Sequence, residues 1–589
     1  MVTTSIGETL PAIFHYRIQH SGDRPAIFSK HDGLFAPVSW SQLARDVTML
    51  AVGLVRCGVQ PGDRVILFSE NRYEWVVVDF AIQLAQAVHV PVHAPLTGSQ
   101  AAFQIADSGA KVAFVSTAQQ VEKLSEAVRA SARSEADVSS GKTRDSAARS
   151  EPSFISETRD WHTGLQIFTF EPNAPAVGNA TVRSWRELMT STSVPESSGI
   201  ARRAVDSVKP NSLATILYTS GTTGEPKGVM LTQQNLVSNA RAATEGFEMS
   251  PKDRRLNFLP LSHIFARTCD LYTWLEAGYE LALAESRESV IADCAAFRPT
   301  LLNGVPYFYD KVRRAIIDLG REGQPDALRK LLGGDIRLCC SGGAALPDHV
   351  FDFFWQHDVP LLQGYGLTET SPVISMSSPD HVRRGASGRT IRDVEVRIAD
   401  DGEILTRGPH IMVGYYKKPE ETADVVRDGW FYTGDLGRVD EDGFVFITGR
   451  KKEILVTSGG KNIAPVYLES LLTEDPLILQ AVVFGDDRDF LSALIVPNSA
   501  ALEQELTRRG ISRPPPAEIS THPDILAYYE ERIRHQLRNV SYYEQIRKFR
   551  LMDRGFSIES GELTPKLSLR RKIIEANCRE LIEGMYKKC

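Results

Sequence analysis

The stretch YTSGTTGEPKG, Tyr218 to Gly228, combines small residues, hydroxyl side chains and one fixed positive charge. Glycines allow the backbone to approach a ligand closely and to turn its amides outward, where successive N–H groups form a nest for anions. Lys227 adds a point charge. The stretch therefore predicts a phosphate-binding loop. The donors that we expect it to supply are the hydroxyls of Thr219, Ser220, Thr222 and Thr223 and the backbone around Gly221 and Gly224.

Two other interpretations of this stretch were weighed. It is not a Walker A loop, because Pro226 stands where the pattern GxxxxGK, counted from Gly221, requires its second glycine. A surface turn rich in Gly and Thr would have the same composition, so the phosphate interpretation depends on other motifs.

The stretch QGYGLTET, Gln363 to Thr370, joins an aromatic ring to a carboxylate through a glycine turn. The face of Tyr365 can stack on a base, and the carboxylate of Glu369 can hold a divalent ion beside phosphates. A dinucleotide-binding motif is a weak alternative, because Glu369 stands where that motif needs glycine. Ordinary core packing is the alternative for Tyr365.

Three further stretches offer polar or exposed groups. SGGAALP presents backbone at Gly342 and Gly343 directly after a strand. YTGDLG places Asp435 in what we expect to be a tight turn, where the carboxylate could accept hydrogen bonds from ribose hydroxyls or only cap the backbone. ITGRKKEILVTSGGKNIAP begins with Arg450, Lys451 and Lys452.

The elements that must position these motifs alternate between strand and helix patterns. Short apolar runs and helical patterns alternate over about residues 24 to 120 and resume near residue 164, which predicts parallel α/β units. The apolar run LATILY predicts a buried strand that leads into the phosphate loop. Residues 131–160 are rich in Ser, Ala and mixed charge, which predicts a flexible insertion. Short strands with turn signals begin near residue 385, and a last mixed unit follows Arg450.

Composition limits the function classes. A chain of 589 residues is too long for one core, and its net charge of -7, spread over both signs, argues against nucleic-acid binding. The seven cysteines show no ligand or disulfide spacing, which favours a reducing, cytoplasmic location. WVVVDFAIQLAQAVHVPV contains Asp79, Gln83, Gln86 and His89, so a buried helix explains it better than a membrane span. Peripheral membrane contact stays open.

These five motifs, in their order and spacing, strongly resemble the adenylate-forming superfamily of acyl-CoA synthetases, adenylation domains and luciferases. PLSHIFARTCDLYTWLEAG, NGVPYFYDKV, QGYGLTETSPVIS and GELTPKLSLRRK resemble the long-chain fatty acid CoA ligases in particular. The resemblance implies an α/β fold with a large N-terminal domain, 1–450, of two α/β sheets and a small β-barrel. It also implies a small mobile α+β C-terminal domain, 451–589.

The resemblance implies a reaction that uses ATP, Mg²⁺ and coenzyme A to convert a fatty acid first to an acyl-adenylate and then to an acyl-CoA. It places the base against Tyr365, Gly366 and the Gly342–Gly343 backbone, and the ribose against Asp435 and Arg450. Thr219 and Glu369 resemble the phosphate and Mg²⁺ contacts, and Thr368 belongs to the same nucleotide site. His263 resembles a position that lines the acyl site or gates the thiol channel, and Lys452 stands at the family's hinge. A packed core histidine and a solvated lysine are the respective alternatives.

The last motif departs from the family pattern. Long-chain relatives have a catalytic lysine where this chain has Ser568, and a lysine stands two residues earlier, at Lys566. Side chains two apart on an extended segment point the same way, about 6–7 Å apart, so we expect Lys566 to replace that lysine. The other expected catalytic residues are Lys227, Glu369 and His263. Two alternative functions stay open: an adenylate former that loads a carrier protein, and a catalytically impaired acyl- or nucleotide-binding homologue.

Overall fold

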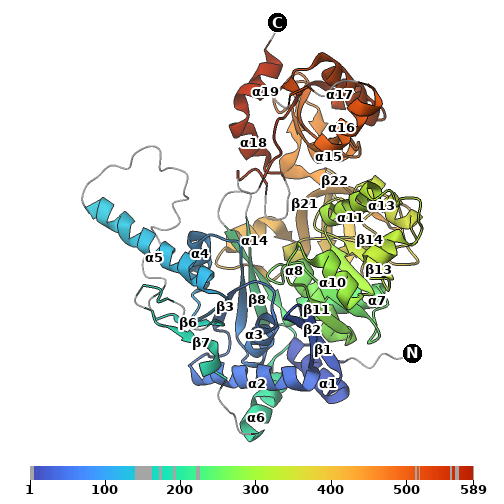
Figure 1. Cartoon of the computed structure of the whole chain (residues 1–589). Helices are drawn as coiled ribbons and strands as arrows, with labels where there is room; N and C mark the ends of the chain where they lie inside the picture. The colour runs from blue at the N-terminus through green and yellow to red at the C-terminus, as the bar shows by residue number, and fades with distance from the viewer. Residues whose placement is uncertain are drawn as a thin grey trace.

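The structure is a computed structural model that describes residues 6–139, 162, 164–171, 175–178, 180–189, 194–220, 226–510, 514–515, 518–557, 560–563 and 569–587. A large N-terminal part contains two long sheets and a smaller antiparallel one, and the C-terminal part stands above it as a separate unit (Figure 1). The α/β class predicted from the alternating patterns is confirmed.

The first long sheet has eight strands and carries the glycine-rich stretch at one side. Its central strands are parallel, whereas β8, β9 and β19 pair antiparallel at the edge. In spatial order the strands are β19 (Gly414–Tyr415), β9 (Pro226–Thr232), β8 (Leu213–Ser220), β4 (Val88–His93), β3 (Arg64–Ser69), β5 (Val112–Val115), β6 (Gln166–Thr169) and β7 (Val182–Ser184).

The second long sheet has nine strands, and the motifs SGGAALP and QGYGLTET lie at the ends of its strands β13 and β14. It is parallel from β14 to β1, with antiparallel strands at both edges. In spatial order the strands are β16 (Arg389–Thr390), β15 (Val373–Met376), β14 (Leu361–Gly366), β13 (Leu338–Ser341), β12 (Leu301–Gly304), β10 (Arg254–Asn257), β11 (Glu280–Leu283), β1 (Pro25–His31) and β2 (Leu34–Ser39).

One apolar cluster joins the two long sheets through the helices between them. Alternate residues of a strand face opposite sides, so Leu338 and Cys340 of β13 belong to this cluster and Cys339 to the cluster on the outer face. The rings of Trp40 and Trp274 stack inside it with centroids 4.3 Å apart. Its helices are α1 (Leu10–Ser21), α2 (Trp40–Arg56), α3 (Tyr73–Leu84), α6 (Val194–Ser207), α7 (Gln233–Gly246) and α9 (Thr273–Ala277).

Other helices cover the outer faces of the two sheets. The outer face of the nine-stranded sheet packs against α10 (Val290–Phe297), α11 (Pro306–Asp318), α12 (Ala327–Leu331) and α13 (Asp348–Gln356). The outer face of the eight-stranded sheet packs against α4 (Gly98–Ser108) and α5 (Ala118–Ser139).

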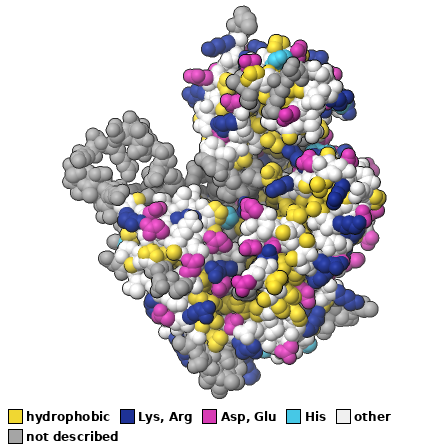
Figure 2. Space-filling view, viewed as in Figure 1, with side chains coloured by type: hydrophobic (Ala, Val, Ile, Leu, Met, Phe, Trp, Pro, Cys, Tyr) yellow, Lys and Arg dark blue, Asp and Glu magenta, His cyan; other side chains and the backbone are white. Residues whose placement is uncertain are grey.

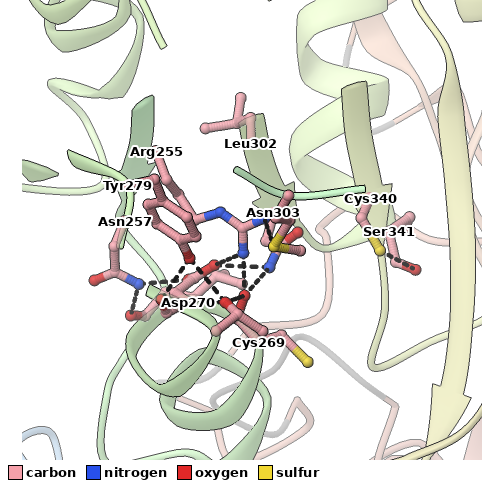
Figure 3. Close-up of polar contacts among 12 residues, drawn as sticks. Arg255, Asn257, Cys269, Asp270, Tyr279, Leu302, Asn303, Cys340 and Ser341 are labelled. Carbon is pink, nitrogen blue, oxygen red and sulfur yellow. Dashed lines mark hydrogen bonds and ion pairs between the residues drawn. The ribbon is translucent and has the colours of Figure 1, made fainter. Parts of the chain in front are cut away.

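A turn of π-helix, η4 (Arg267–Tyr272), connects the two sheets by buried charges. Arg267 donates to Asp79 on α3 over 2.6 Å and to Thr215 on β8 over 2.8 Å. Asp270 accepts from Asn257 and Asn303 over 2.7 Å each and from Arg255 over 2.9 Å, all on the nine-stranded sheet (Figure 3). The side chains of Arg267 and Asp270 are almost fully buried, so each needs these partners.

The segments after residue 390 form a smaller sheet, the edge strand β19 of the eight-stranded sheet and the C-terminal unit. The expected small barrel is represented by a five-stranded antiparallel sheet of β17 (Glu395–Ile398), β18 (Glu403–Arg407), β21 (Trp430–Val439), β20 (Val426–Arg427) and β22 (Val445–Arg450). The C-terminal unit contains β23 (Leu455–Val456), β24 (Asn462–Ile463), β25 (Ile478–Phe484), β26 (Leu491–Pro497) and β27 (Ile546–Leu551). Its helices are α15 (Pro465–Thr473), α16 (Ser499–Arg508), α17 (Pro523–Gln536), α18 (Arg571–Asn577) and α19 (Arg579–Tyr586).

Three sequence-based expectations need correction or comment. Helix α5 continues to Ser139, so the first part of the expected flexible insertion at 131–160 is helical, and residues 140–160 lie outside the described ranges. The apolar stretch near residue 80 divides into helix α3 and strand β4 because Gln86, with φ of 59°, turns the chain between them. No helix in the described ranges is both long and apolar enough to cross a membrane.

Basic and acidic side chains are interspersed on the face of the molecule shown in Figure 2. This distribution agrees with the small net charge of the sequence and offers no extended basic surface on that face.

Candidate active site

Residues on both sides of the glycine-rich segment form paired strands. Strand β8 extends to Ser220 and β9 begins at Pro226, and Thr219 pairs with Lys227 across the two strands. Hydrogen bonds between the strands thus continue into residues that composition alone assigns to a loop. Gly221, Thr222, Thr223 and Gly224, for which we predicted phosphate contacts, lie outside the described residues, as does the side chain of Ser220.

Lys227 and Glu369 both contact Tyr415, a residue that no local motif indicated. The Lys227 ammonium lies 4.8 Å from the centroid of the Tyr415 ring and forms an ion pair with Glu421 on α14 (Pro419–Val425). The Tyr415 hydroxyl donates to Glu369 Oε1 over 2.9 Å. Burial, followed by the Glu369 charge, raises the pKa of Tyr415, so the hydroxyl stays protonated and remains a donor.

Amide side chains of α7 hold this part of the site in place. Asn239 donates to the Val373 carbonyl over 2.8 Å and accepts from the Val373 amide over 3.1 Å, which fixes the chain just after Glu369. Asn235 donates to the carbonyls of Pro409 and Ile411 over 2.7 and 2.9 Å. One helix therefore fixes both the Glu369 turn and the segment that leads to Tyr415.

A second polar group joins Tyr365, Asp435 and Arg450. The Tyr365 hydroxyl donates to Asp435 Oδ2 over 2.8 Å, and Arg450 Nε lies 2.9 Å from Asp435 Oδ1. Burial raises the pKa of Asp435, whereas Arg450 and Tyr365 lower it by favouring the carboxylate. Asp435 lies on β21 opposite Arg450 of β22, so the expected tight turn is wrong. Gly434 has a left-handed φ of 71°, which favours glycine, and this glycine makes the strand resemble a turn in the sequence.

Backbone approaches explain the glycines beside these groups. A Cβ at Gly342 would lie 2.9 Å from the ring of Phe265, and Gly343 has a left-handed φ of 82°. A Cβ at Gly366 would lie 1.7 Å from the Pro372 carbonyl oxygen, so no other residue fits this turn. Tyr365, next to it, is half-buried.

His263 fixes the turn that carries Phe265. Its Nδ1 accepts from the Phe265 amide over 3.2 Å and caps α8 (Ile264–Ala266). The imidazole thereby connects the segment that follows β10 to the Gly342 backbone through the Phe265 ring. This contact is compatible with both a structural role and a role beside the acyl group.

The donor set at the Glu369 side fits a hard cation. Carboxylate and hydroxyl oxygens, as offered by Glu369 and Thr219, are the ligands that Mg²⁺ prefers, and Mg²⁺ is bound by few protein groups together with substrate phosphates. Within the described ranges, no group of three or more His, Cys, Asp or Glu side chains could hold a metal ion by itself.

The remaining predicted residues lie at the edges of the site. Thr368 forms the short helix η5 (Thr368–Thr370) with Glu369. Lys452 lies in the short helix η6 (Lys451–Glu453), which begins directly after Arg450. Lys566 and Ser568 lie outside the described residues.

Tyr415 and Glu421 are the residues that sequence reasoning missed. Their place in the site depends on the pairing of β19 with β9, between segments far apart in the chain. The only local signal is the stretch GYYKKPEETAD, in which a proline followed by acidic residues is typical of a helix start.

Two family profiles match segments of this chain. The profile of the AMP-binding enzyme matches residues 14–416, and that of the AMP-binding enzyme C-terminal domain matches residues 452–589. The chain belongs to the AMP-binding enzyme family. Lys227, Tyr365, Glu369 and Tyr415 lie within the first matched segment, whereas Asp435 and Arg450 lie between the two matched segments.

Relatives and solved structures agree with this membership. The chain is 34% identical to the long-chain-fatty-acid–CoA ligase FadD15 of Mycobacterium bovis, over 95% of this chain and 93% of that protein. It is 27% identical to the human long-chain-fatty-acid–CoA ligase ACSBG1, over 98% and 85%. The fold of this AMP-binding enzyme resembles ATP-bound MatB from Rhodopseudomonas palustris, with a TM-score of 0.73, 23% identity and coverage of 99% and 100%. It also resembles a Mycobacterium tuberculosis fatty acyl CoA synthetase, with a TM-score of 0.64, 20% identity and coverage of 98% and 99%.

Proposed function

We propose that this AMP-binding enzyme is a long-chain fatty acid CoA ligase. The observation that carries the proposal is the assembly of two polar groups at the two ends of one turn. Tyr365 at one end contacts Asp435 and Arg450, and Glu369 at the other contacts Tyr415, beside Lys227. One group suits a nucleoside and the other suits phosphates. The choice of a fatty acid as the substrate rests on the names of the relatives.

The proposed reaction has two halves. A fatty acid carboxylate oxygen attacks the α-phosphorus of ATP, and the bond to the pyrophosphate oxygen breaks, which leaves an acyl-adenylate. The thiolate of coenzyme A then attacks the acyl carbon, and AMP leaves with the electrons of the broken acyl–oxygen bond. The anhydride is needed because a free carboxylate is a poor electrophile.

Each group in the site has a proposed role in the first half. Lys227 and the β8–β9 hairpin would bind the β- and γ-phosphates, where preorganised donors stabilise developing charge. Asp435 would accept from the ribose hydroxyls while Arg450 and Tyr365 hold its carboxylate in place. Thr219 and Glu369 would hold Mg²⁺, which supplies shielding of phosphate charge when bound. Lys566 would reach the α-phosphate and the carboxylate.

His263 and Phe265 would face the acyl group or the incoming thiol, because they lie against the Gly342 backbone of the nucleotide site. The C-terminal unit, from about Lys451, would move between the two halves. We place the enzyme in the cytoplasm, because the spacing of its seven cysteines suits a reducing compartment. Peripheral contact with a membrane remains compatible with a lipid substrate.

The decisive test measures pyrophosphate release and thioester formation with palmitate and ATP, with and without coenzyme A. A ligase releases pyrophosphate faster with coenzyme A and forms palmitoyl-CoA. Pyrophosphate release that does not depend on coenzyme A would favour loading of a carrier protein. The absence of pyrophosphate release would favour a binding homologue. A series of acids of graded length, assayed for thioester formation, then defines the chain-length range.

A further inference from the structure

The ammonium group of Lys227 is already paired in the structure. It forms an ion pair with Glu421 Oε2, and the other oxygen of that carboxylate lies 3.2 Å from the ammonium of Lys418. The Lys227 side chain is 20% exposed and that of Glu421 is 35% exposed. The pair therefore lies at the border of the site, where a solute could reach it.

The fold holds the two partners on adjoining elements, so their meeting does not depend on side-chain rotation alone. Lys227 lies on β9, which pairs with β19 through Val229 and Tyr415. The Tyr415 amide donates over 2.9 Å to the hydroxyl of Thr422, the residue after Glu421 on α14. A Cβ at Gly414 would lie 2.7 Å from the Thr422 side chain, so α14 packs directly on β19.

The charge of Glu421 opposes the ligand that Lys227 would bind. The Lys227 ammonium lowers the pKa of Glu421, so this carboxylate is ionised at neutral pH. A triphosphate that reaches Lys227 must displace the carboxylate or bind beside a like charge, and either event weakens binding.

We propose that Glu421 is the counter-ion of Lys227 in the ligand-free enzyme and that the phosphates of ATP displace it. Glu421 thereby sets the affinity for ATP without contacting the acyl chain. This inference rests on the proposed function, because it takes Lys227 as a phosphate ligand. It assigns Glu421 as a positioning residue that acts through Lys227.

The neighbouring residue supplies a matched control. Glu420 stands in the same first turn of α14 and carries the same charge, but its side chain is exposed. A general effect of negative charge near a helix start would be common to both residues. Displacement from Lys227 concerns Glu421 alone.

The test compares Glu421→Gln and Glu420→Gln by equilibrium binding of ATP and by the ATP and palmitate dependence of pyrophosphate exchange. We expect Glu421→Gln to tighten ATP binding by about two- to fivefold, as a partly exposed ion pair permits. The KM for palmitate should not change, and the gain should shrink at high salt because screening weakens the pair. Glu421→Asp, with a shorter side chain, should lie between wild type and Glu421→Gln.

Two outcomes would overturn the inference: an ATP affinity that stays equal or falls in Glu421→Gln, or the same gain in Glu420→Gln. Lys227→Met separates this inference from the proposed function. If Lys227→Met binds ATP as wild type does, Lys227 is not a phosphate ligand and the inference is wrong. If wild type binds ATP but forms no acyl-CoA, the ligase proposal fails while the binding comparison still decides the role of Glu421.

Discussion

Tyr415 contacts both Lys227 and Glu369, the two charged groups that we propose as phosphate and Mg²⁺ contacts. Its hydroxyl donates to Glu369 and its ring lies beside the Lys227 ammonium, so one side chain fixes both positions. A hydrogen bond to a charged group contributes about 1.5–3 kcal/mol, which is enough to orient a carboxylate. The side chain therefore connects β9, β19 and η5 at the place where catalysis would need fixed geometry.

Tyr415→Phe keeps the ring and removes the donor. We expect the Mg²⁺ concentration for half-maximal pyrophosphate exchange to rise by about tenfold, because Glu369 loses the group that orients it. Tyr528→Phe is the control, since its hydroxyl also donates to a glutamate, Glu505, over 2.9 Å but lies in the C-terminal unit. Equal Mg²⁺ dependence in wild type and Tyr415→Phe would contradict this role.

A buried histidine predicts how stability changes with pH. His410 is buried, and burial lowers its pKa to about 4. The unfolded chain, with a histidine pKa of about 6.5, binds a proton that the folded chain does not bind between these values. Stability is therefore unaffected above about pH 7 and is lost as pH falls, by about 2 kcal/mol at pH 5. His89, whose pKa is also lowered to about 4 by burial, acts in the same direction.

The measurement is the melting temperature of wild type and His410→Gln at pH 8 and pH 5. Whatever the substitution costs at pH 8, the drop between the two pH values should be smaller in His410→Gln. A drop of the same size in both proteins would show that His410 does not titrate in this range.

At the scale of elements, η4 holds the two long sheets together by paired buried charges. Arg267 reaches the eight-stranded sheet and Asp270 the nine-stranded sheet, from positions one turn apart. Thr215 lies on the strand that leads to Thr219, and Asn303 lies on β12 beside the strand that ends at Ser341. The relative placement of the phosphate hairpin and the Gly342 backbone thus depends on η4.

Asp270→Asn would leave Arg255 buried without its counter-charge (Figure 3). Breaking a buried pair by removing one partner costs about 3–5 kcal/mol, so we expect a large fall in melting temperature. Asp293→Asn is the matched control, because Asp293 is equally buried but its partner Lys30 is 15% exposed and can turn to water. If the two variants melt alike, the charge balance at η4 is not what stabilises the junction.

Much of the element order followed from the sequence, and the exceptions share a cause. Strand β8 stands where the continuous apolar run LATILY predicted a buried strand. Thr219 and Asp435 were predicted to lie in a loop and in a turn, because both stand near glycines. The strands that hold them are specified by partners, Lys227 opposite Thr219 and Arg450 opposite Asp435, which local sequence does not show.

The residues of the candidate site also fall into two groups, those that local motifs indicate and those that depend on contacts between distant segments. Tyr365, Asp435 and Arg450 could be selected from local motifs, and the structure brings them into contact. Tyr415, Glu421 and the η4 charges could not, because their roles arise from contacts between distant segments. The roles of the glycine-rich residues 221–224 and of Lys566 stay predictions, since these residues lie outside the described ranges.

The link between the N-terminal part and the C-terminal unit is confined to a few residues. Lys451 pairs with Asp401 over 2.5 Å and with Glu403 over 2.9 Å, which ties it to the five-stranded sheet. Leu455 and Ile463 already belong to the apolar cluster of the C-terminal unit. On these contacts we propose that the hinge lies within residues 452–454.

Lys452→Pro should restrict rotation at this hinge, because proline fixes φ near −65° and also limits the residue before it. If the C-terminal unit must move between the half-reactions, thioester formation from preformed acyl-adenylate should fall far more than pyrophosphate exchange. Lys452→Ala removes the charge but keeps the backbone free, so it should spare both. Equal loss of both half-reactions in Lys452→Pro would indicate misfolding, and selective loss in Lys452→Ala would assign the effect to the side chain instead of to rotation.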